Sequence, residues 1–522
     1  MFADGLLHRI PGAMADHAPG TVVLVDGDRR WTAAEFDELV NGLATGLRRH
    51  TRPGDRIAVV SDNRAEFVAL LYAAPRAGCV LTMGNTRHTT DELVAVLADV
   101  RPTLVLASGD HLARLLGRAD DLPSIGSWWH LDHGPPPAGA GGLASLVDGA
   151  NDPDDWPAAT PNDHVWLIHT SGTTSRAKGV VLTHRSLLAA VAATTPARPM
   201  GPDDVYLFPF PLFHVAAYNV VHAHVHHRPV VLCARFEAGE VLATIEREQV
   251  TQVSLAPTML TMLLDHPDRP STDLSSLRRI SYGASPMAPD LVRRTIRELP
   301  HVGLAQGYGM TELSGNAVFL SPDEHRRAVT DQPELLRAAG RPGPGVRLRI
   351  ADEAGRALPD DTAGEIMVTG EQVCAGYWER PDAEADAFHH DRDGTRWLRT
   401  GDLGTLSSDG VLFVVDRVKD IVITGGENVS SREVEDLLTD HPAVAAAAVV
   451  GVPDERWGEL VCAVVVWQDR DGVRPSAQEL VEWTAGRIAG FKRPRRIVPV
   501  DALPTNASGK VDKRALRQFL SA

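Results

Sequence analysis

Short apolar runs alternate with segments of helical period throughout the first 400 residues of this 522-residue chain. Residues 56–61 (RIAVVS) and 102–107 (PTLVLA) have the continuous apolar character of buried strands. Between them, residues 65–78 have the period of a helix that ends at a glycine. Alternation of this kind is typical of layered folds in which helices cover a sheet, so the sequence predicts an α/β fold.

Two helix starts are marked by capping boxes. Thr32 is followed three residues later by Glu35, and Thr89 is followed in the same way by Glu92. With this spacing the threonine hydroxyl and the glutamate carboxylate can each satisfy a backbone N–H of the first helical turn. Both boxes precede a periodic apolar face, so helices are predicted to begin directly after them.

Length and charge limit the possible architectures and partners. A chain of 522 residues exceeds what one hydrophobic core usually holds, so roughly two to four lobes are expected. The formal net charge is −16, from 52 basic and 68 acidic side chains. This balance argues against a nucleic-acid partner, although a small polyanion needs only a local positive field. We expect a monomer or a homodimer.

The cysteines and the apolar runs indicate the compartment. The four cysteines have no CxxC spacing, which argues against a disulfide framework or a zinc ribbon and favours a reducing cytoplasm. The N-terminal residues lack the apolar core of a signal peptide. The longest apolar run, residues 443–452, is too short to span a bilayer. We therefore expect a soluble cytoplasmic protein without a membrane partner.

Two changes in composition suggest boundaries. Residues 133–163 are rich in Pro, Gly, Ala and Asp, which indicates a surface connection. After Asp416 the chain shows a strand, a charged turn and an amphipathic helix over residues 430–438. Apolar β-type runs follow at 443–450 and 460–466, joined by a loop that contains Pro453. This pattern predicts a small α+β domain, with an N-terminal domain over residues 1–416 and a C-terminal domain over residues 417–522.

Residues 169–180 (HTSGTTSRAKGV) are the most informative stretch. They follow a predicted strand at 165–168 and combine hydroxyls, glycine and a single lysine, Lys178. Backbone N–H groups and hydroxyls in such a loop can surround phosphate oxygens while the lysine adds positive charge. The spacing is not that of a Walker A loop. The alternative interpretation is a flexible polar surface loop.

Further motifs follow in a fixed order along almost the whole chain. They are residues 208–214 (FPFPLFH), 282–285 (YGAS), 306–312 (QGYGMTE), 364–365 (GE), 397–402 (WLRTGD), 416–420 (DRVKD), 425–428 (GGEN) and 508–510 (SGK). In this order they resemble the adenylate-forming superfamily, which includes acyl- and aryl-CoA synthetases, adenylation domains of peptide synthetases and beetle luciferases.

The resemblance implies a fold and a reaction. The fold would be a large N-terminal domain of layered sheets and helices with a β-barrel-like subdomain, and a small mobile α+β C-terminal domain. The reaction would be ATP-dependent conversion of a carboxylic acid to acyl-AMP with release of pyrophosphate, followed by thioester formation with coenzyme A. Mg²⁺ would accompany ATP. The alternative is an enzyme that passes the acyl group to a carrier protein.

By this resemblance, several short segments form the nucleotide site. Its residues would be Thr170, Ser171, Gly172, Thr173, Thr174, Lys178, Gly283, Ala284, Ser285, Gln306, Gly307, Tyr308, Gly309, Thr311, Asp402 and Arg417. Tyr308 would lie against adenine, Thr311 would meet the α-phosphate, and Glu312 would face Mg²⁺, which prefers one or two carboxylates with phosphate oxygens. Asp402 would accept hydrogen bonds from the ribose diol, and Arg417 would bridge nucleotide oxygens.

The resemblance also assigns the moving parts. Lys510 would be the catalytic lysine that stabilises charge as the carboxylate attacks the α-phosphorus. The C-terminal domain would rotate at Lys419, withdraw Lys510 and present Gly425 and Gly426 to the pantetheine arm of CoA. A simple turn is the alternative explanation for Gly425. The predicted catalytic residues are Lys510, Thr311, Glu312 and His214.

The acyl pocket is predicted at His214, Val215 and Ala216. Peptide-synthetase domains bind the substrate amine with an aspartate where this chain has Val215, so an α-amino acid is not expected. An apolar wall suits a fatty, alicyclic or aromatic acid, and the lack of an obvious charged anchor disfavours a small dicarboxylate. His222 and His226 have i,i+4 spacing, but a polar helix end is a better interpretation than a metal site.

The chain departs from the superfamily pattern at four places. Ser175 stands where glycine is usual, Ala177 where proline is usual, His169 where tyrosine is frequent, and Thr505 where a basic residue is common. None of these changes removes a group assigned to chemistry. They leave room for an enzyme that performs mainly one half-reaction. A non-catalytic nucleotide sensor is the third hypothesis, and the joint presence of the predicted catalytic groups argues against it.

Overall fold

A computed structural model describes residues 5–147, 156–170, 177–468, 474–506 and 510–521. The chain divides into two compact units, Met1–Arg347 with Thr369–Leu398, and Leu348–Val368 with Arg399–Ala522. Among the described residues, no helix is both long enough and apolar enough to cross a membrane.

Two sheets form the framework of the first unit. In spatial order, the nine-stranded sheet consists of β16 (Arg341–Pro342), β15 (Gly315–Leu320), β14 (Gly303–Met310), β13 (Arg279–Tyr282), β12 (Gln252–Leu255), β10 (Tyr206–Phe208), β11 (Val230–Leu232), β1 (Val22–Asp26) and β2 (Arg29–Thr32). The eight-stranded sheet consists of β19 (Gly376–Tyr377), β9 (Lys178–Thr183), β8 (His164–Thr170), β4 (Val80–Met83), β3 (Arg56–Val60), β5 (Leu104–Ala107), β6 (Ser127–His130) and β7 (Gly141–Gly142).

Both sheets are parallel in the middle and antiparallel at an edge. Strands β3, β4 and β5 pair in parallel and are buried almost throughout, as expected for strands covered on both faces. Strands β9 and β19 add antiparallel pairs at one edge of the eight-stranded sheet. In the nine-stranded sheet, β15 and β16 do so at one edge and β2 does so at the other. The predicted α/β fold is confirmed.

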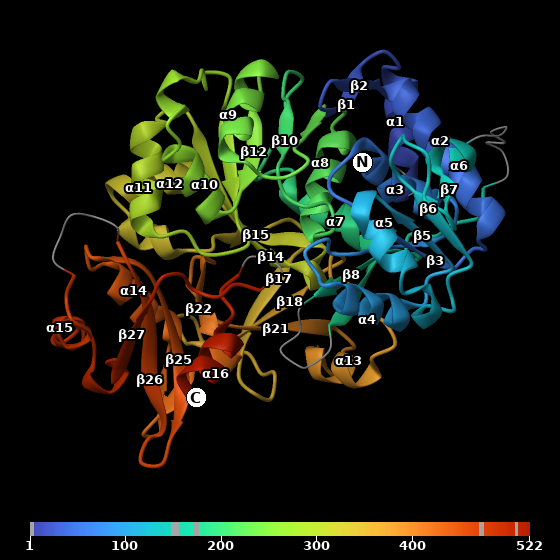
Figure 1. Cartoon of the computed structure of the whole chain (residues 1–522). Coiled ribbons are helices and arrows are strands. Elements are labelled where there is room, and N and C mark those ends of the chain that lie inside the picture. Colours follow the sequence, from blue (N-terminus) through green and yellow to red (C-terminus); the bar gives the residue numbers. More distant parts are fainter. Residues whose placement is uncertain (1–4, 148–155, 171–176, 469–473, 507–509, 522) are drawn as a thin grey trace. The chain divides into compact units, whose positions relative to one another are not determined.

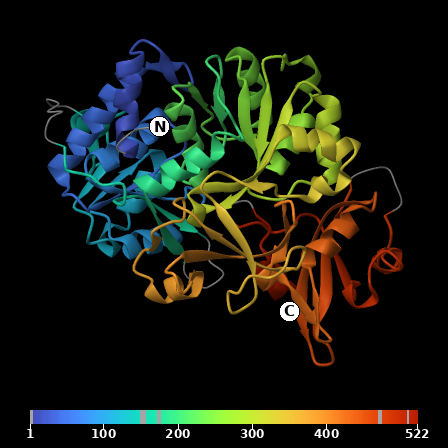
Figure 2. The ribbon, with the colours of Figure 1, turned by 180° about the vertical axis from the view of Figure 1, so that it is seen from behind.

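Helices pack against these sheets, mostly as βα units. They are α1 (Ile10–His17), α2 (Ala33–His50), α3 (Ala65–Arg76), α4 (Thr90–Val100), α5 (Gly109–Leu116), α6 (Leu143–Val147), α7 (His184–Thr194), α8 (Tyr218–Val225), α9 (Ala238–Arg247), α10 (Pro257–Leu264), α11 (Pro289–Glu298), α12 (Pro322–Thr330) and α13 (Pro381–Ala387). Segments from blue to cyan build most of the eight-stranded half, and green to yellow segments build most of the nine-stranded half (Figures 1 and 2).

Both predicted capping boxes are present. The hydroxyl of Thr32 accepts from the N–H of Glu35 at 3.3 Å, and the glutamate carboxylate accepts from the N–H of Thr32 at 2.9 Å. The same reciprocal pair joins Thr89 and Glu92 at the start of α4.

The predicted connection at 133–163 contains a short helix, α6. Leu143 and Leu146 of this helix are buried, and the helix contacts α2. The helix was not predicted, because the sequence around it has a low apolar content.

The second unit begins with a small sheet. Its strands within this unit are β17 (Arg347–Ala351), β18 (Gly364–Thr369) and β21 (Arg396–Leu406), and β22 (Leu412–Arg417) pairs with β21 in the antiparallel direction. The first residues of β21, up to Leu398, pair with β20 (Phe388–His390) within the first unit.

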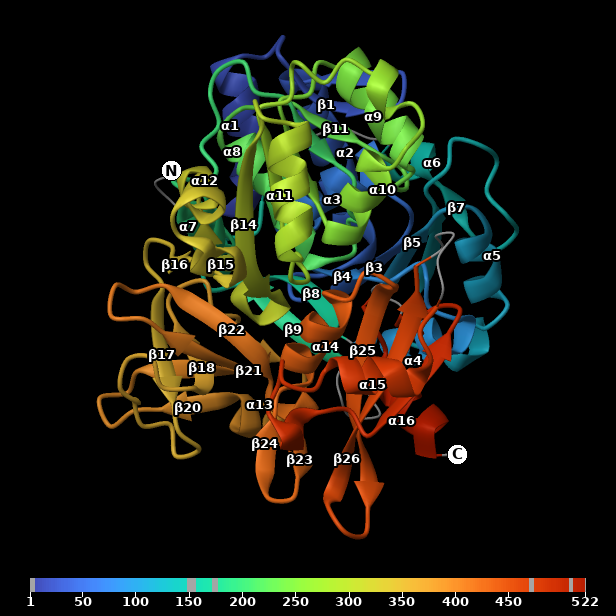
Figure 3. The same cartoon turned by 90° about the vertical axis from the view of Figure 1, so that its left-hand side faces the viewer.

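A last sheet forms the α+β part of the second unit. Its order is β24 (Glu427–Val429), β23 (Val422–Thr424), β26 (Gly458–Trp467) and β25 (Val444–Asp454), and β27 (Arg496–Val500) also pairs with β26. Helices α14 (Ser431–Thr439) and α16 (Lys513–Ser521) contact β25 (Figure 3), and α15 (Ala477–Trp483) contacts β27 (Figure 1).

Alternating side chains of this sheet build two cores. Val449 and Val461 pack on the side of α14 and α15, whereas Val450 and Cys462 pack on the side of α16. The prediction that Pro453 lies in a loop is wrong, because Pro453 pairs with Glu459 inside the β25–β26 hairpin. Proline is tolerated there because β25 lies at the edge of the sheet and has a ladder partner on one side only.

Candidate active site

The hairpin of β14 and β15 positions the central predicted motif. Strand β14 ends at Met310, and a short 3-10 turn, η5 (Thr311–Leu313), carries Thr311 and Glu312, which are both half-buried. A Cβ atom on Gly309 would lie 2.0 Å from the carbonyl oxygen of Gly315. Glycine is therefore required at this position for the two strands to approach, and the motif is held on a rigid hairpin.

Glu312 and Lys178 meet at one aromatic side chain, Tyr377. The Tyr377 hydroxyl donates to Oε1 of Glu312 at 3.0 Å, and Nζ of Lys178 lies 5.2 Å from the centroid of the Tyr377 ring. Strand β19 brings Tyr377 to this place by pairing with Val180 of β9, the strand that begins at Lys178. Two motifs separated by more than a hundred residues in the sequence thus converge at Tyr377, a residue outside every predicted motif.

The segment that precedes Tyr377 is fastened to the η5 turn. The N–H of Cys374 donates to the Glu312 carbonyl oxygen at 2.8 Å, and Nε2 of Gln372 donates to the Leu313 carbonyl oxygen at 3.0 Å. In return, the hydroxyl of Ser314 donates to the carbonyl oxygen of Gln372 at 2.9 Å. These bonds fix the position of the segment that carries Tyr377 relative to the η5 turn that carries Glu312.

Electrostatics keep Tyr377 in its donor form. Burial, and then the neighbouring Glu312 carboxylate, raise the pKa of Tyr377 well above its ordinary value. A protonated hydroxyl beside an ionised carboxylate makes a charge-assisted hydrogen bond. Tyr377 therefore orients the carboxylate across the neutral pH range.

Only the ends of the predicted phosphate loop fall in the described part of the chain. Thr170 pairs with Lys178 at the open end of the β8–β9 hairpin, and both are half-buried. The predicted residues Ser171, Gly172, Thr173 and Thr174, together with Ser175, lie outside the described residues.

The predicted adenine wall is built on β13 and β14. The hydroxyl of Tyr282 donates to Oε1 of Gln306 at 3.0 Å and also contacts Nε2 of the buried His325 at 2.8 Å. Directly after β13, Gly283 is half-buried, Ala284 has a left-handed φ of 67°, and Ser285 is exposed. A turn in this conformation exposes backbone groups at the end of a parallel strand, where ligands bind in open α/β sheets.

Gly307 and Tyr308 follow Gln306 on β14. Gly307 is buried, and a Cβ atom there would lie 2.1 Å from Nδ2 of Asn316 on β15. Tyr308 is half-buried at the next position along the strand.

The predicted acyl wall lies at the start of α8. His214 precedes a 3-10 turn, η3 (Val215–Ala217), and its ring packs edge-on against Phe213 with centroids 4.7 Å apart. His214, Val215 and Ala216 are half-buried. The prediction that the later histidines form a polar helix end is wrong for His222 and His224, because both are buried within α8. Among the residues that the structure describes, no group of three His, Cys, Asp or Glu side chains has a metal-binding arrangement.

Asp402 and Arg417 are brought together in the second unit. They are paired residues of β21 and β22, and Nε of Arg417 lies 3.1 Å from Oδ1 of Asp402. Asp402 is buried and Arg417 is exposed, so the carboxylate is held in the fold while the guanidinium can reach outward.

Asp416 anchors the segment around the predicted hinge. Its Oδ2 accepts from the hydroxyls of Ser430 and Ser431 at 3.0 Å each, and from the N–H of Arg432 at 3.2 Å. The carboxylate therefore caps the N-terminus of α14. Lys419 lies three residues later, exposed in the short turn η7 (Val418–Asp420).

Gly425 and Gly426 form the two-residue loop between β23 and β24. Their φ values are 60° and 82°, so both adopt the left-handed conformation that tight hairpins demand. The turn by itself accounts for both glycines. Lys510 is exposed, and its N–H donates to Oδ1 of Asn506 at 3.1 Å.

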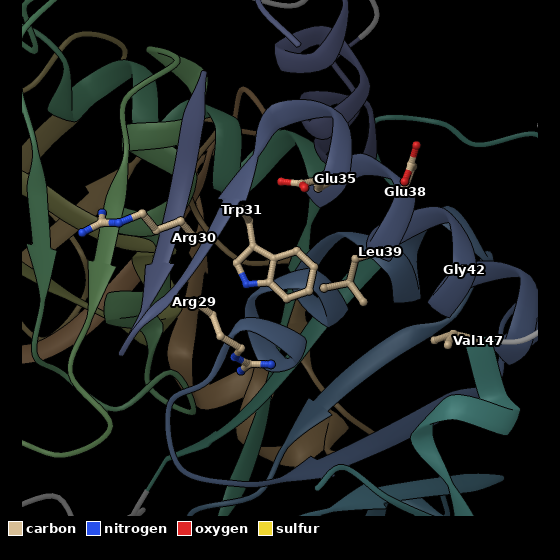
Figure 4. A pocket seen from close by; sticks show the side chains of 8 residues that line it. All are labelled: Arg29, Arg30, Trp31, Glu35, Glu38, Leu39, Gly42 and Val147. Atoms are coloured by element: carbon tan, nitrogen blue, oxygen red, sulfur yellow. The ribbon is translucent and has the colours of Figure 1, made fainter. Parts of the chain in front are cut away.

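A surface hollow of 570 Å³ lies elsewhere on the first unit, near β2, α2 and α6 (Figure 4). Trp31, Glu38 and Val147 are among its lining residues. None of the predicted site residues lines it.

Comparison with known proteins identifies the family. The sequence matches the family described as AMP-binding enzyme over residues 13–378 and the AMP-binding enzyme C-terminal domain over residues 433–510. It is 37% identical to feruloyl-CoA synthase of an Amycolatopsis species, over 97% of this chain and 98% of the relative.

Solved structures agree over almost the full length. The amide bond synthetase McbA from Marinactinospora thermotolerans has a TM-score of 0.86 and 33% identity, and the match covers 98% of this chain and 99% of that chain. The o-succinylbenzoate CoA synthetase MenE from Bacillus subtilis, solved with its acyl-adenylate intermediate, has a TM-score of 0.84 and 30% identity over 98% of both chains. The chain belongs to the AMP-binding enzyme family, in the acyl-CoA synthetase branch of the adenylate-forming superfamily.

Proposed function

We propose that this AMP-forming acid–thiol ligase adenylates a carboxylic acid at the Glu312–Tyr377–Lys178 cluster and then forms its CoA thioester. The convergence of these three side chains carries the proposal, since it places a carboxylate and a cation from two distant motifs beside one ring. A carboxylate for a metal ion and a cation for phosphate oxygens are what a bound nucleoside triphosphate requires.

In the first step a carboxylate oxygen of the acid attacks the α-phosphorus of ATP, and the bond from that phosphorus to the pyrophosphate oxygen breaks. Lys178 and the loop after Thr170 would hold the outer phosphates, and Thr311 would contact the α-phosphate. Lys510 would offset the charge between the two anionic reactants. Asp402 and Arg417 would bind the ribose and the adjoining oxygens, and Tyr308 would lie against adenine with Gly283–Ser285.

Mg²⁺ would be held by Glu312 together with phosphate oxygens. The half-buried carboxylate has Oε1 engaged by Tyr377, whereas no described residue hydrogen-bonds to Oε2, so the side chain fits a single-carboxylate site. When bound, the ion neutralises charge on the phosphates.

In the second step the thiol sulfur of CoA attacks the acyl carbon, the bond from that carbon to the AMP oxygen breaks, and the thiol proton is released. Residues 417–522 would rotate at Lys419 to remove Lys510 and present Gly425 and Gly426. Asp416 accepts hydrogen bonds from Ser430 and Ser431 at the start of α14, so these bonds cross the proposed pivot and rotation at Lys419 would break them.

We propose an acid with an apolar body. Val215 and Ala216 on η3 offer apolar contacts, and feruloyl-CoA synthase and o-succinylbenzoate CoA synthetase are named for acids that contain an aromatic ring. CoA is the proposed acceptor in the cytoplasm, with a carrier protein as the alternative.

The experiment is an acid panel with ATP and Mg²⁺ in which acid-dependent pyrophosphate exchange is measured first. CoA, or an acyl carrier protein with its pantetheine arm, is then added, and the thioester is identified by mass spectrometry. Exchange followed by acyl-CoA formation is expected. Exchange followed by thioester on the carrier protein alone would reject CoA as the acceptor, and an absence of exchange with every acid would reject the proposal.

A further inference from the structure

A group of polar side chains buried behind the predicted acyl wall is not used by the chemistry described above. Arg198, which follows α7, has 6% of its surface exposed, and Asn219 and His222 on α8 have 5% and 1%. Within the described residues, Nε of Arg198, Oδ1 of Asn219 and Nε2 of His222 have no hydrogen-bond partner. Nε of Arg279 on β13, whose side chain is also largely buried, likewise has no hydrogen-bond partner among the described residues.

These side chains form one cluster. The guanidinium of Arg198 donates to the hydroxyl of Tyr218 and, at 3.4 Å, to the hydroxyl of Ser254. Tyr218 and His222 are four residues apart on α8, so they share a face of the helix, and Asn219 lies beside them. Burial, followed by the charges of Arg198, His226 and Arg279, lowers the pKa of His222, so this imidazole is neutral.

The cluster holds more positive charge than its neighbours balance. No carboxylate of the described residues lies within ion-pair distance of Arg198 or Arg279. The Asp204 carboxylate attracts the positive charge of Arg279. Its oxygens, however, already accept hydrogen bonds from Thr251 at 2.7 Å and from Gln252 at 2.9 Å. A guanidinium cannot lose its proton in a protein, and a buried charge without a partner is costly. An oxygen acceptor supplied from outside would offset this cost.

Tyr218 connects the cluster to the reacting end of the site. A Cβ atom on Gly315 would lie 3.0 Å from the Tyr218 ring, and Gly315 is the β15 partner of Met310, which directly precedes Thr311. Nδ2 of Asn219 donates to the carbonyl oxygen of Ala216 at 2.9 Å, which joins the cluster to the predicted acyl wall as well. Val215 on η3 and His222 on α8 lie on consecutive elements, with the first turn of α8 between them.

We propose that Arg198, Asn219 and His222 form the far end of the acyl site and select acids that carry a polar oxygen there. The oxygen would be a phenol, ketone or carboxylate oxygen on the end of the acid remote from the reacting carboxyl. Arg198 Nε would donate to it, and the Asn219 oxygen or the neutral His222 would accept from a hydroxyl proton. This inference rests on the proposed function, because it names the class of acid that the adenylating site takes.

Matched acids test the proposal. Exchange kinetics are compared for 4-hydroxycinnamate against cinnamate, for 3-(4-oxocyclohexyl)propanoate against 3-cyclohexylpropanoate, and for suberate against octanoate. We expect kcat/KM to favour the oxygen-bearing member of at least one pair by at least about tenfold, because a site built to hydrogen-bond an oxygen leaves its own buried groups unpaired when the analogue lacks it. Arg198→Met should reduce that ratio to about one while it preserves or raises kcat/KM for the hydrocarbon member.

Further variants separate recognition from folding. Arg198→Lys should retain part of the preference, Asn219→Ala should lower it, and Arg293→Met on exposed α11 should leave it unchanged. If Arg198→Met fails to fold, the ratios for Arg198→Lys and Asn219→Ala decide. Equal use of both members of every pair by the wild-type protein, or an unchanged ratio in the variants, would overturn this inference and leave the ligase activity standing. Absence of exchange with any acid would instead overturn the proposed function.

Discussion

The hydroxyl of Tyr377 donates a hydrogen bond of 3.0 Å to Oε1 of Glu312, and the face of the same ring receives the ammonium group of Lys178 at 5.2 Å. One side chain on a two-residue strand thus sets the spacing between the predicted metal-facing carboxylate and the predicted phosphate-binding cation. In the proposed mechanism, adenylation depends on positioned charge and not on a covalent nucleophile, so small changes in this spacing should affect the reaction strongly.

Removing the Tyr377 hydroxyl should weaken adenylation. In Tyr377→Phe the ring beside Lys178 is retained, while the Glu312 carboxylate loses its charge-assisted donor. Such a bond is worth about 1.5–3 kcal/mol, so pyrophosphate exchange should fall by about tenfold or more and the Mg²⁺ concentration for half-maximal rate should rise. Tyr206→Phe, which loses a hydroxyl bond to Ser254 on another strand, is the matched control for the Mg²⁺ requirement. An unchanged Mg²⁺ requirement in Tyr377→Phe would contradict the orienting role.

Substitution of Asp402 should weaken ATP binding. Asp402→Asn keeps the size of the side chain but removes the charge that faces Arg417 and the oxygen that would accept from the second ribose hydroxyl. We expect KM for ATP to rise by about tenfold, with a smaller change in KM for the acid. Asp290→Asn, an exposed position on α11, serves as the control. A KM for ATP within twofold of the wild-type value would show that Asp402 does not bind the nucleotide.

Acid should destabilise the protein through His325. Burial lowers the pKa of this imidazole to about 4, below its ordinary 6.5. The unfolded chain therefore binds a proton at a higher pH than the folded one, and stability is full above pH 6.5 and is lost as the pH falls toward 4. Between pH 7 and pH 5, this difference in the pKa of His325 lowers the free energy of unfolding by about 2 kcal/mol.

The comparison of wild-type protein with His325→Gln isolates this contribution, because glutamine can keep a hydrogen bond to Tyr282 without titrating. Urea denaturation at pH 7 and pH 5 should show a loss of unfolding free energy that is smaller in the variant by about 2 kcal/mol. Equal losses in the two proteins would mean that His325 already accepts a proton in the folded state at pH 5.

Local patterns in the sequence were enough for much of the fold. The capping boxes at Thr32 and Thr89 predicted the starts of α2 and α4, because both partners of each box lie within one turn. Apolar continuity predicted β3 and β5, which are buried on both faces. Pro453 was misplaced, because only the pairing of β25 shows that a proline at this edge does not interrupt the strand.

The site was predictable only where a motif carries its own chemistry. Thr311, Glu312 and Lys178 stand in polar motifs with an unusual composition, and they were recognised. Tyr377 was missed because its partners lie in other segments. The residues next to Gly376 and Tyr377 give no sign that the tyrosine hydroxyl makes a hydrogen bond in the site. Arg198 was missed for the same reason, since its burial among Tyr218 and Ser254 depends on elements far apart in the chain.

The partial reactions of a Lys510→Ala variant test the central claim most directly. If adenylation and thioester formation are separate steps that depend on charge from different surfaces, pyrophosphate exchange should fall at least about a hundredfold. Thioester formation from synthetic acyl-AMP and CoA should stay within about threefold of the wild-type rate. Lys492→Ala, which removes a lysine that pairs with Glu433, should leave both rates unchanged. Undiminished exchange in Lys510→Ala, or an equal loss of both partial reactions, would contradict the account.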